Sequence, residues 1–412
     1  ILSYNYTDDF TFVPAPLTFN RDSAATRVNE KGLIETVGAD QPRIDYSDSL
    51  TEPSLLLEPQ STNTATYSND FTQGDIFNSS SNPSLINSVL TSQQAISPDG
   101  TNNAWLLKDN NSGGTGNSEI RFNSTNVTSN DFNTISIFVK KALTNNFLIL
   151  QSINYDISGS GSSWFNISNG TLGTIDSDHT AKIEDYGNGW YRCQITFKTT
   201  TDLIGIVRIR LASSDNSSVV TRDGTNGVYL YGLQCEADAT QNYATSYIPT
   251  SGSTATRLGE TANNAGDVNV FNSEEGVLYA EIAALADDGT NRSISLSDGS
   301  VNNRISLLFG TSSNRIRAIV KNNNSTSFDE EYEVTSTLNY HKVAIKYKLN
   351  NFALWIDSVE RFTDTSGSTP IGLNKLMFDV GSGILPFYGK TKDLKVFNKA
   401  LTDRELEILT IQ

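Results

Sequence analysis

Short runs that alternate hydrophobic and polar residues recur along most of the chain. In 134–139, for example, Ile135, Ile137 and Val139 fall on one face of an extended chain, since successive side chains of a strand point to opposite sides. Similar strand-like runs, separated by polar turns, lie at 104–107, 147–150, 190–197, 204–211 and 228–233. Short strands at this spacing predict a β-sandwich for residues 66–258.

A second set of alternating runs follows the small, polar stretch 262–266, which has the composition of a linker. Val343 and Ile345 alternate with polar residues, and after an Asn-containing turn the alternation resumes at Phe352. This pattern predicts a β-hairpin, placed within a second sandwich over residues 259–412.

Both ends of the chain depart from this pattern. Residues 1–65 have little periodicity and carry five prolines, each of which lacks a backbone donor, so they predict an extended arm. Its short apolar pieces, such as 55–57, have the character of edge strands that add to a neighbouring sheet. Near the other end, Thr402 and Glu405 have the spacing of a capping box, which predicts one short C-terminal helix. The predicted fold class is therefore all-β, with an arm, two antiparallel jelly-roll sandwiches and that helix.

The charge balance excludes several partners. With 30 Lys and Arg against 46 Asp and Glu, the net charge of −16 repels nucleic-acid phosphates and anionic lipid headgroups. The longest apolar candidate, 203–207, is closed by Arg208 and is far shorter than a membrane-spanning helix. We therefore expect neither nucleic-acid binding nor membrane insertion.

Cysteine and histidine usage limits the covalent and metal chemistry. Cys193 and Cys235 are too few for a disulfide-built scaffold, and their strand-like surroundings favour buried free thiols over a bridge. Two histidines without a cysteine cluster argue against a zinc site.

Several motifs resemble a segment that recurs in tailed-bacteriophage fibre, tail and other virion proteins, followed by a jelly roll similar to carbohydrate-binding modules. The motifs of the first segment lie at 17–29, 32–35, 42–46 and 55–59, and those of the jelly roll at 97–101, 188–193, 229–237 and 244–250. The last unit is similar to concanavalin A-like or laminin-G-like lectin sandwiches, through 354–357, 387–390 and 394–401. This resemblance implies a protein on the virion surface, homotrimeric in fibres, that contacts other virion proteins and host cell-surface glycans. Such modules also occur in secreted bacterial proteins.

Catalysis is weakly indicated. Glycan cleavage requires two carboxylates flanking the scissile bond. The stretch 329–333 departs from the Glu-x-Asp-x-x-Glu spacing of concanavalin-like glucanases, and we expect a solvated turn there. His179 and His341 lack a recognisable nucleophile and are expected to be surface or strand-end residues.

Glycan binding instead requires flat aromatic side chains beside planar polar groups. Trp105 lies in an apolar run and Trp190 in a strand motif, and both are expected in the core. The candidate ligand-binding residues are Trp164, Tyr155, Trp355 and Tyr340. Trp355 alternates out of phase with its buried neighbours, and Trp164 follows a Gly/Ser-rich loop.

Calcium is the metal ion that the sequence makes plausible, because hard oxygen ligands are abundant. The candidate ligands are Asp287, Asp288 and Asn291, although solvated turns account for them as well. No cofactor is required by this reading. We therefore predict a non-catalytic phage virion surface or fibre protein that binds host glycans for adhesion. The alternatives are a purely structural virion protein, such as a capsid decoration or tail connector, and a polysaccharide depolymerase.

Overall fold

The computed structural model describes residues 3–6, 12–73, 83–156 and 159–412. Over these residues the protein is nearly all-β, with several antiparallel sheets and a short C-terminal helix, which confirms the predicted fold class. No helix in the described ranges is long and apolar enough to cross a membrane. The chain forms two compact units. Unit 1 comprises Ile1–Ser23, Val37–Pro59 and Leu258–Gln412, and unit 2 comprises Ala24–Thr36 and Gln60–Arg257.

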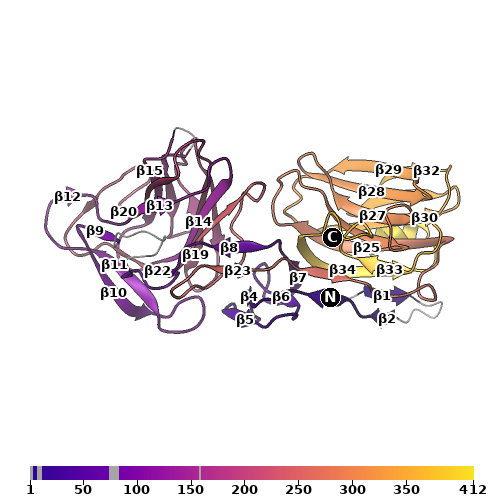
Figure 1. Ribbon diagram of the computed structural model, residues 1–412, viewed down its shortest axis with the longest axis horizontal. Helices are drawn as coiled ribbons and strands as arrows, with labels where there is room; N and C mark the ends of the chain where they lie inside the picture. The colour runs from indigo at the N-terminus through magenta and orange to yellow at the C-terminus, as the bar shows by residue number, and fades with distance from the viewer. Residues whose placement is uncertain (1–2, 7–11, 74–82, 157–158) are drawn as a thin grey trace. The chain divides into compact units, whose positions relative to one another are not determined.

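Unit 2 is a sandwich whose described residues form two six-stranded sheets (Figure 1). The β14 sheet has the spatial order β10 (Ser88–Ala95), β11 (Ala104–Asp109), β22 (Gly227–Asp238), β14 (Phe132–Lys141), β19 (Trp190–Phe197) and β18 (Thr180–Asp185). The β20 sheet has the order β17 (Thr171–Leu172), β16 (Gly161–Asn166), β15 (Phe147–Ile153), β20 (Ile204–Ala212), β13 (Glu119–Asn126) and β9 (Ser84–Ile86). Smaller pairs join β12 (Thr115–Gly116) to β21 (Val220–Thr221), β8 (Ser61–Asn63) to β23 (Ala255–Arg257), and β4 (Ala25–Val28) to β5 (Ile34–Val37).

Alternation along the strands places the core of unit 2 between these two sheets. Ile135, Ile137 and Val139 of β14 are at most 2% exposed and belong to the same cluster as Leu148 of β15 and Ile209 of β20. The same cluster contains both cysteines, which are buried and free, as the sequence predicted. Burial raises the pKa of the Cys193 thiol, which keeps it protonated and unreactive.

Unit 1 is a second sandwich. Its larger sheet has the order β2 (Phe12–Ala15), β1 (Ser3–Tyr6), β34 (Gly389–Phe397), β25 (Glu275–Ala284), β30 (His341–Lys348), β31 (Phe352–Ile356) and β32 (Val359–Asp364), with β6 (Arg43–Asp45) and β7 (Ser54–Leu57) attached. The other sheet has the order β29 (Ser325–Glu333), β28 (Arg315–Asn322), β27 (Arg304–Phe309), β26 (Arg292–Ser297) and β33 (Lys375–Met377). A separate pair joins β3 (Thr18–Asn20) to β24 (Thr261–Asn263). The predicted hairpin is confirmed as β30 and β31, which pair antiparallel.

Short strands of the N-terminal segment add to other parts of the chain, as expected from their composition. Within unit 1, β7 pairs with the first residues of β34, Gly389–Thr391, and β3 pairs with β24. Beside these strands lies a buried ion cluster formed by Arg21, Arg43, Glu58 and Glu260, each with a side chain at most 5% exposed. Burial opposes the charge of Arg43, but Glu58 and Glu260 raise its pKa overall, so this guanidinium stays charged. The cluster ties the N-terminal segment to the chain that follows Arg257.

One expectation about polar residues is wrong. The stretch 329–333 is not a solvated turn but part of strand β29, where Asp329 pairs with Arg317 of β28. His179 and His341 lie at strand ends, one of the two placements that the sequence predicted: His341 is the first residue of β30, and His179 directly precedes β18. Each is buried, at 7% exposure.

The C-terminal helix α1 (Asp403–Leu409) begins with the predicted capping box, in which Thr402 and Glu405 bond to each other's backbone amides. Its residue Leu406 is fully buried against the larger sheet of unit 1. Replacing Thr402 with Ala is expected to lower the free energy of unfolding by about 1 kcal/mol, because the amide of Glu405 in the first turn loses its acceptor. Chemical denaturation of the full chain measures this loss. Thr402→Ser retains the acceptor oxygen and should stay within about 0.5 kcal/mol of the parent; an equal loss in both variants would contradict the capping role.

Candidate functional site

One face of the β20 sheet carries an ordered set of polar side chains. Leu148, Leu150 and Ile209 of this sheet point into the core, so the alternate positions form its outer face. Strand register arranges these positions in rows across the sheet. One row contains Ser162, Gln151, Arg208, Arg121 and Ser84, and the next contains Trp164, Ile149, Arg210, Glu119 and Ile86. We call these two rows the arginine face.

Charge on the arginine face is concentrated around one buried carboxylate. Glu119 has a fully buried side chain and bonds to Arg121 and Arg210, while Nε of Arg208 lies 3.9 Å from its Oε1. Burial opposes ionisation of Glu119, yet the bonds from Arg121 and Arg210 lower its pKa overall. The carboxylate therefore stays ionised and bound to arginine.

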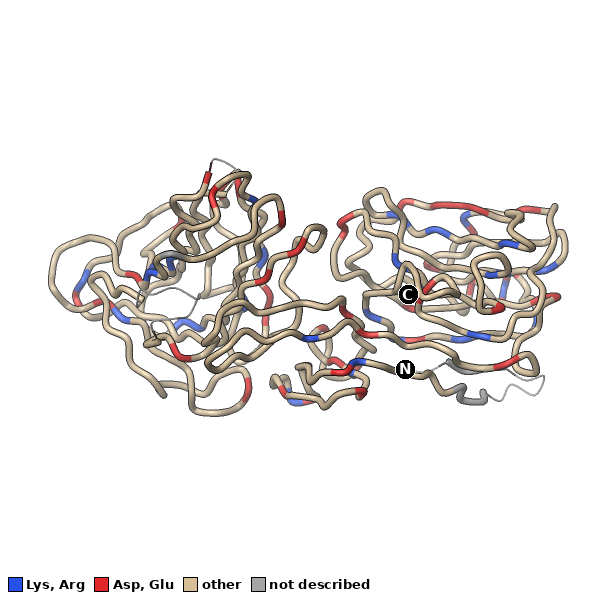
Figure 2. The backbone as a smooth tube through the Cα atoms, viewed as in Figure 1, with Lys and Arg blue, Asp and Glu red and all other residues tan. Residues whose placement is uncertain are grey.

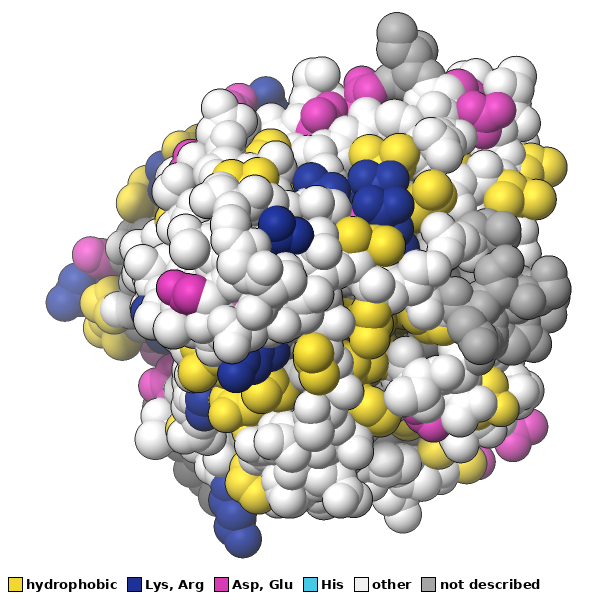
Figure 3. Space-filling model, turned by 90° about the vertical axis from the view of Figure 1, so that its left-hand side faces the viewer, with side chains coloured by type: hydrophobic (Ala, Val, Ile, Leu, Met, Phe, Trp, Pro, Cys, Tyr) yellow, Lys and Arg dark blue, Asp and Glu magenta, His cyan; other side chains and the backbone are white. Residues whose placement is uncertain are grey.

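Basic, hydrophobic and uncharged side chains lie together on the surface of unit 2. Figure 2 shows basic positions close together where β13 and β20 run side by side. Figure 3, which looks onto unit 2, shows Lys and Arg side chains gathered near the middle of the view among hydrophobic and uncharged groups, with few acidic groups between them. A surface of this composition combines directional donors with apolar contact area.

Two hydrogen-bonding atoms on the arginine face are buried without a partner. Oε1 of Gln151 accepts no bond, although its Nε2 donates to Ser162 Oγ at 2.7 Å. Nε of Arg208 donates none. Because an unpaired buried polar group costs about 1–3 kcal/mol, such atoms are satisfied most economically by a bound polar molecule or water. The face thus holds one buried acceptor and one buried donor that lack partners.

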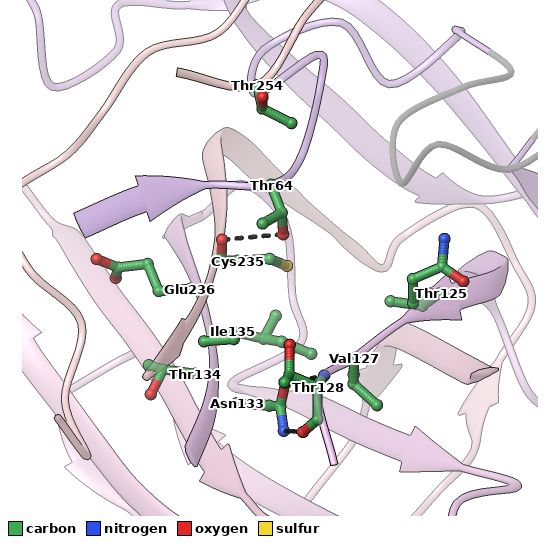
Figure 4. A pocket seen from close by; sticks show the side chains of 12 residues that line it. Thr64, Thr125, Val127, Thr128, Asn133, Thr134, Ile135, Cys235, Glu236 and Thr254 are labelled. Carbon is green, nitrogen blue, oxygen red and sulfur yellow. Dashed lines mark hydrogen bonds between the residues drawn. The ribbon is translucent and has the colours of Figure 1, made fainter. Parts of the chain in front are cut away.

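Unit 2 also contains a pocket of about 250 Å³ at the ends of β13, β14 and β22. It is lined mainly by hydroxyl and amide side chains with Cys235 and Glu236 (Figure 4). These groups already have partners: Thr64 donates to the carbonyl of Cys235, and Glu236 accepts from Thr245 and Ser61. None of the buried unpaired side-chain atoms found in the described chain belongs to this pocket, so the arginine face is the better candidate.

Two of the aromatic residues predicted to bind a glycan lie in unit 2, on opposite sides of the β20 sheet. Trp164 lies on the arginine face, 9% exposed, and its indole N–H donates to the Ser217 carbonyl at 2.8 Å. Tyr155 is 6% exposed within the core, and its hydroxyl donates to the Thr125 carbonyl at 2.9 Å. The structure therefore places Trp164, but not Tyr155, on the same sheet face as the arginine cluster, with Ile149 between Trp164 and Arg210 in the row.

The other two predicted residues, Trp355 and Tyr340, lie in unit 1 and do not belong to a common side-chain cluster. Trp355 points away from the main core, as its alternation indicated, but the C-terminal helix covers it and leaves it 7% exposed. Tyr340 is partly exposed and donates from its hydroxyl to Asp48 at 2.9 Å, with the Lys392 ammonium 4.4 Å from its ring centroid. Glycan contact by these four residues remains a prediction.

The proposed calcium ligands lie in the turn between β25 and β26. Asp288 is held by Arg292 through two bonds of 2.9 and 2.5 Å, and Asp287 accepts from the amide of Asn314 at 2.9 Å. Oδ1 of Asn291 is buried without a partner. Among the described residues, no group of three or more His, Cys, Asp or Glu side chains is arranged to hold a metal ion. Since Asp288 is already paired with arginine, the remaining oxygen donors are few, and calcium here remains a prediction.

Sequence reasoning missed the arginine face. Its signal is present locally, because Glu119 and Arg121, and likewise Arg208 and Arg210, are two residues apart in strand-like runs and so share a face. The two runs pair with each other although Glu119 and Arg210 are 91 residues apart. A local sequence pattern does not predict this pairing.

Comparisons with known proteins do not identify a family for this chain. No family model matches the sequence, and no curated protein matches it. Among solved structures, the mouse laminin alpha1 chain, domains LG4-5, is similar with 9% sequence identity and a TM-score of 0.23, covering 69% of this chain and 91% of that chain. A laminin G-domain structure is thus a neighbour, but at this score the likeness carries no argument about function. These findings do not bear on the phage resemblance.

Proposed function

We propose that this protein is a non-catalytic carbohydrate-binding protein and that the arginine face of unit 2 is its glycan site. The observation that carries the proposal is the pair of buried, unpartnered atoms, Gln151 Oε1 and Arg208 Nε, on the sheet face that also carries Trp164. Sugar hydroxyls both donate and accept hydrogen bonds, so they can satisfy both atoms at once. Planar amide and guanidinium groups fix their orientation, and the edge of Trp164 adds apolar contact.

The charges on this face support a non-catalytic role in this proposal. Glycoside hydrolysis uses two carboxylates, one of which must act as an acid. Among the residues of the two rows, Glu119 is the one carboxylate, and its arginine partners hold it ionised. It is therefore unsuited to donate a proton, and binding is the activity that this arrangement supports.

The finer assignment rests on the sequence resemblance. We propose a phage virion surface or fibre protein that adheres to host polysaccharide, is displayed as a homotrimer and is held by other virion proteins. Three copies would raise the apparent affinity of weak individual sites through a high effective concentration. Binding requires no cofactor in this proposal; calcium, if the turn at Asp287 takes it, would order that turn.

A glycan array with the full chain tests the proposal. Gln151→Leu removes the free acceptor at nearly unchanged volume and should weaken binding about 2- to 12-fold, the range for one net hydrogen bond. The matched control is Gln94→Leu on the exposed edge strand β10 of the other sheet, which should bind like the parent. Arrays with and without calcium report on the ion. Failure of the parent to bind any glycan, or equal binding by Gln151→Leu, would rule out this site.

A further inference from the structure

We infer that the arginine face selects glycans bearing an anionic group, such as a uronate carboxylate or a sulfate ester, and that Arg208 is the residue that contacts it. This inference rests on the proposed function and names the substrate class of that same site. It starts from the charges: three arginines share one carboxylate, so the cluster keeps an excess of two positive charges (3 − 1). The whole chain has a net charge of −16, so a local excess of positive charge runs against its overall charge.

The three arginines are not equivalent. Arg121 and Arg210 bond directly to Glu119, whereas Arg208 is 3.9 Å from it and has a buried Nε without a partner. Burial, together with the charges of Arg121 and Arg210, lowers the pKa of Arg208 despite the opposing effect of Glu119. The positive charge of Arg208 is thus the least compensated of the three.

Geometry places this charge where a ligand can reach it. The side chains of Arg121, Arg208 and Arg210 retain 27%, 18% and 11% exposure. Gln151 is the neighbour of Arg208 in the same row, and its Oε1 is buried without a hydrogen-bond partner. A guanidinium fork matches the two oxygens of a carboxylate or sulfate, and the adjacent amide acceptor matches a hydroxyl of the same sugar.

Acidic groups near the face do not cancel this charge. The carboxylate of Asp176 accepts from the amide of Ser162 on β16 at 3.2 Å. Strand β16 is two strands from β20, or about 10 Å at ordinary strand spacing. At that distance physiological salt screens most of the interaction. An anion bound at Arg208 therefore experiences a net attraction.

The test compares acidic oligosaccharides with neutral counterparts of the same backbone. The carboxylate arm uses oligogalacturonates and hyaluronan fragments with their carboxyl-reduced forms, and the sulfate arm uses dextran sulfate with dextran. The full chain should bind at least one acidic form about 10- to 100-fold more tightly than its counterpart, the range for a charge-assisted bond. This preference should shrink as ionic strength rises.

Variants assign the preference to Arg208. Arg208→Gln should bind acidic and neutral forms equally while remaining folded, because Glu119 keeps Arg121 and Arg210. Arg208→Lys should retain part of the preference, since it keeps the charge but loses the fork. Arg27→Gln, which removes an arginine paired with Glu35 elsewhere in unit 2, is the control and should behave like the parent.

Two results would overturn the inference in different ways. Equal binding of acidic and neutral forms by the parent would reject the anionic class and leave glycan binding intact. A preference that persists in Arg208→Gln would reject the role of Arg208. Absence of binding to every oligosaccharide and to the glycan array would reject the proposed function, and the inference with it.

Discussion

Replacing Glu260 with Gln is expected to lower the free energy of unfolding of unit 1 by about 3–5 kcal/mol, the usual cost of breaking a buried ion pair. Glu260 bonds to Arg21 and Arg43, and it accepts the amide of Glu58 at 2.8 Å. Its loss leaves two buried guanidinium groups with only the Glu58 carboxylate among the cluster's acids. Both are too deeply buried for water to compensate.

Calorimetric melting of the full chain measures this effect as a downward shift of one transition. The matched control is Glu407→Gln on helix α1, because its partner Arg404 is 73% exposed and such pairs contribute about 0–1 kcal/mol. If Glu260→Gln unfolds within 1 kcal/mol of the parent, the cluster does not hold the N-terminal segment in place.

Acidification is expected to destabilise unit 2 by about 3 kcal/mol through His179 alone. The imidazole is enclosed between Ser152 Oγ at 2.7 Å and Ser163 Oγ at 2.8 Å. Burial lowers its pKa from 6.5 to about 4, against the opposing charge of Asp176. The unfolded chain therefore binds a proton that the folded chain excludes between these two values. This contribution to stability is fully present above pH 6.5 and is lost as the pH falls toward 4.

Denaturant unfolding at several pH values between 4 and 7 measures this loss. His179→Gln should be less stable than the parent at pH 7 but should lose less stability on acidification, and the difference between the two curves isolates the histidine. His341→Gln is the control. Burial acts to lower the pKa of His341, but the bond to Asp357 raises that pKa overall. The contribution of His341 to the stability of unit 1 therefore grows on acidification, opposite to that of His179. Parallel curves for the parent and His179→Gln would contradict the assignment.

Local patterns predicted the elements but not the contacts between them. The alternation around Val343 and Phe352 and the capping box at Thr402 depend on residues within a few positions of one another, and the structure confirms both. The β-sandwich class likewise follows from the spacing of short strands.

The site depends instead on distant parts of the chain. Trp164 loses its exposure because its indole reaches Ser217, and Trp355 because a helix about 50 residues later covers it. Glu119 meets Arg210 only because β13 pairs with β20. The sequence displays each of these residues as an isolated side chain in a strand, so their chemistry could be recognised only once the sheet register was known.

The most direct test of the central claim is an NMR titration of the arginine Nε–Hε signals with the oligosaccharide that binds most tightly. Arg208→Lys assigns the signal of Arg208. The expected result is that this signal moves as binding saturates, because its Nε–H gains an acceptor, while the signal of Arg27 stays unchanged. Saturable binding without any change at Arg208, or no oligosaccharide that binds, would contradict glycan recognition by the arginine face.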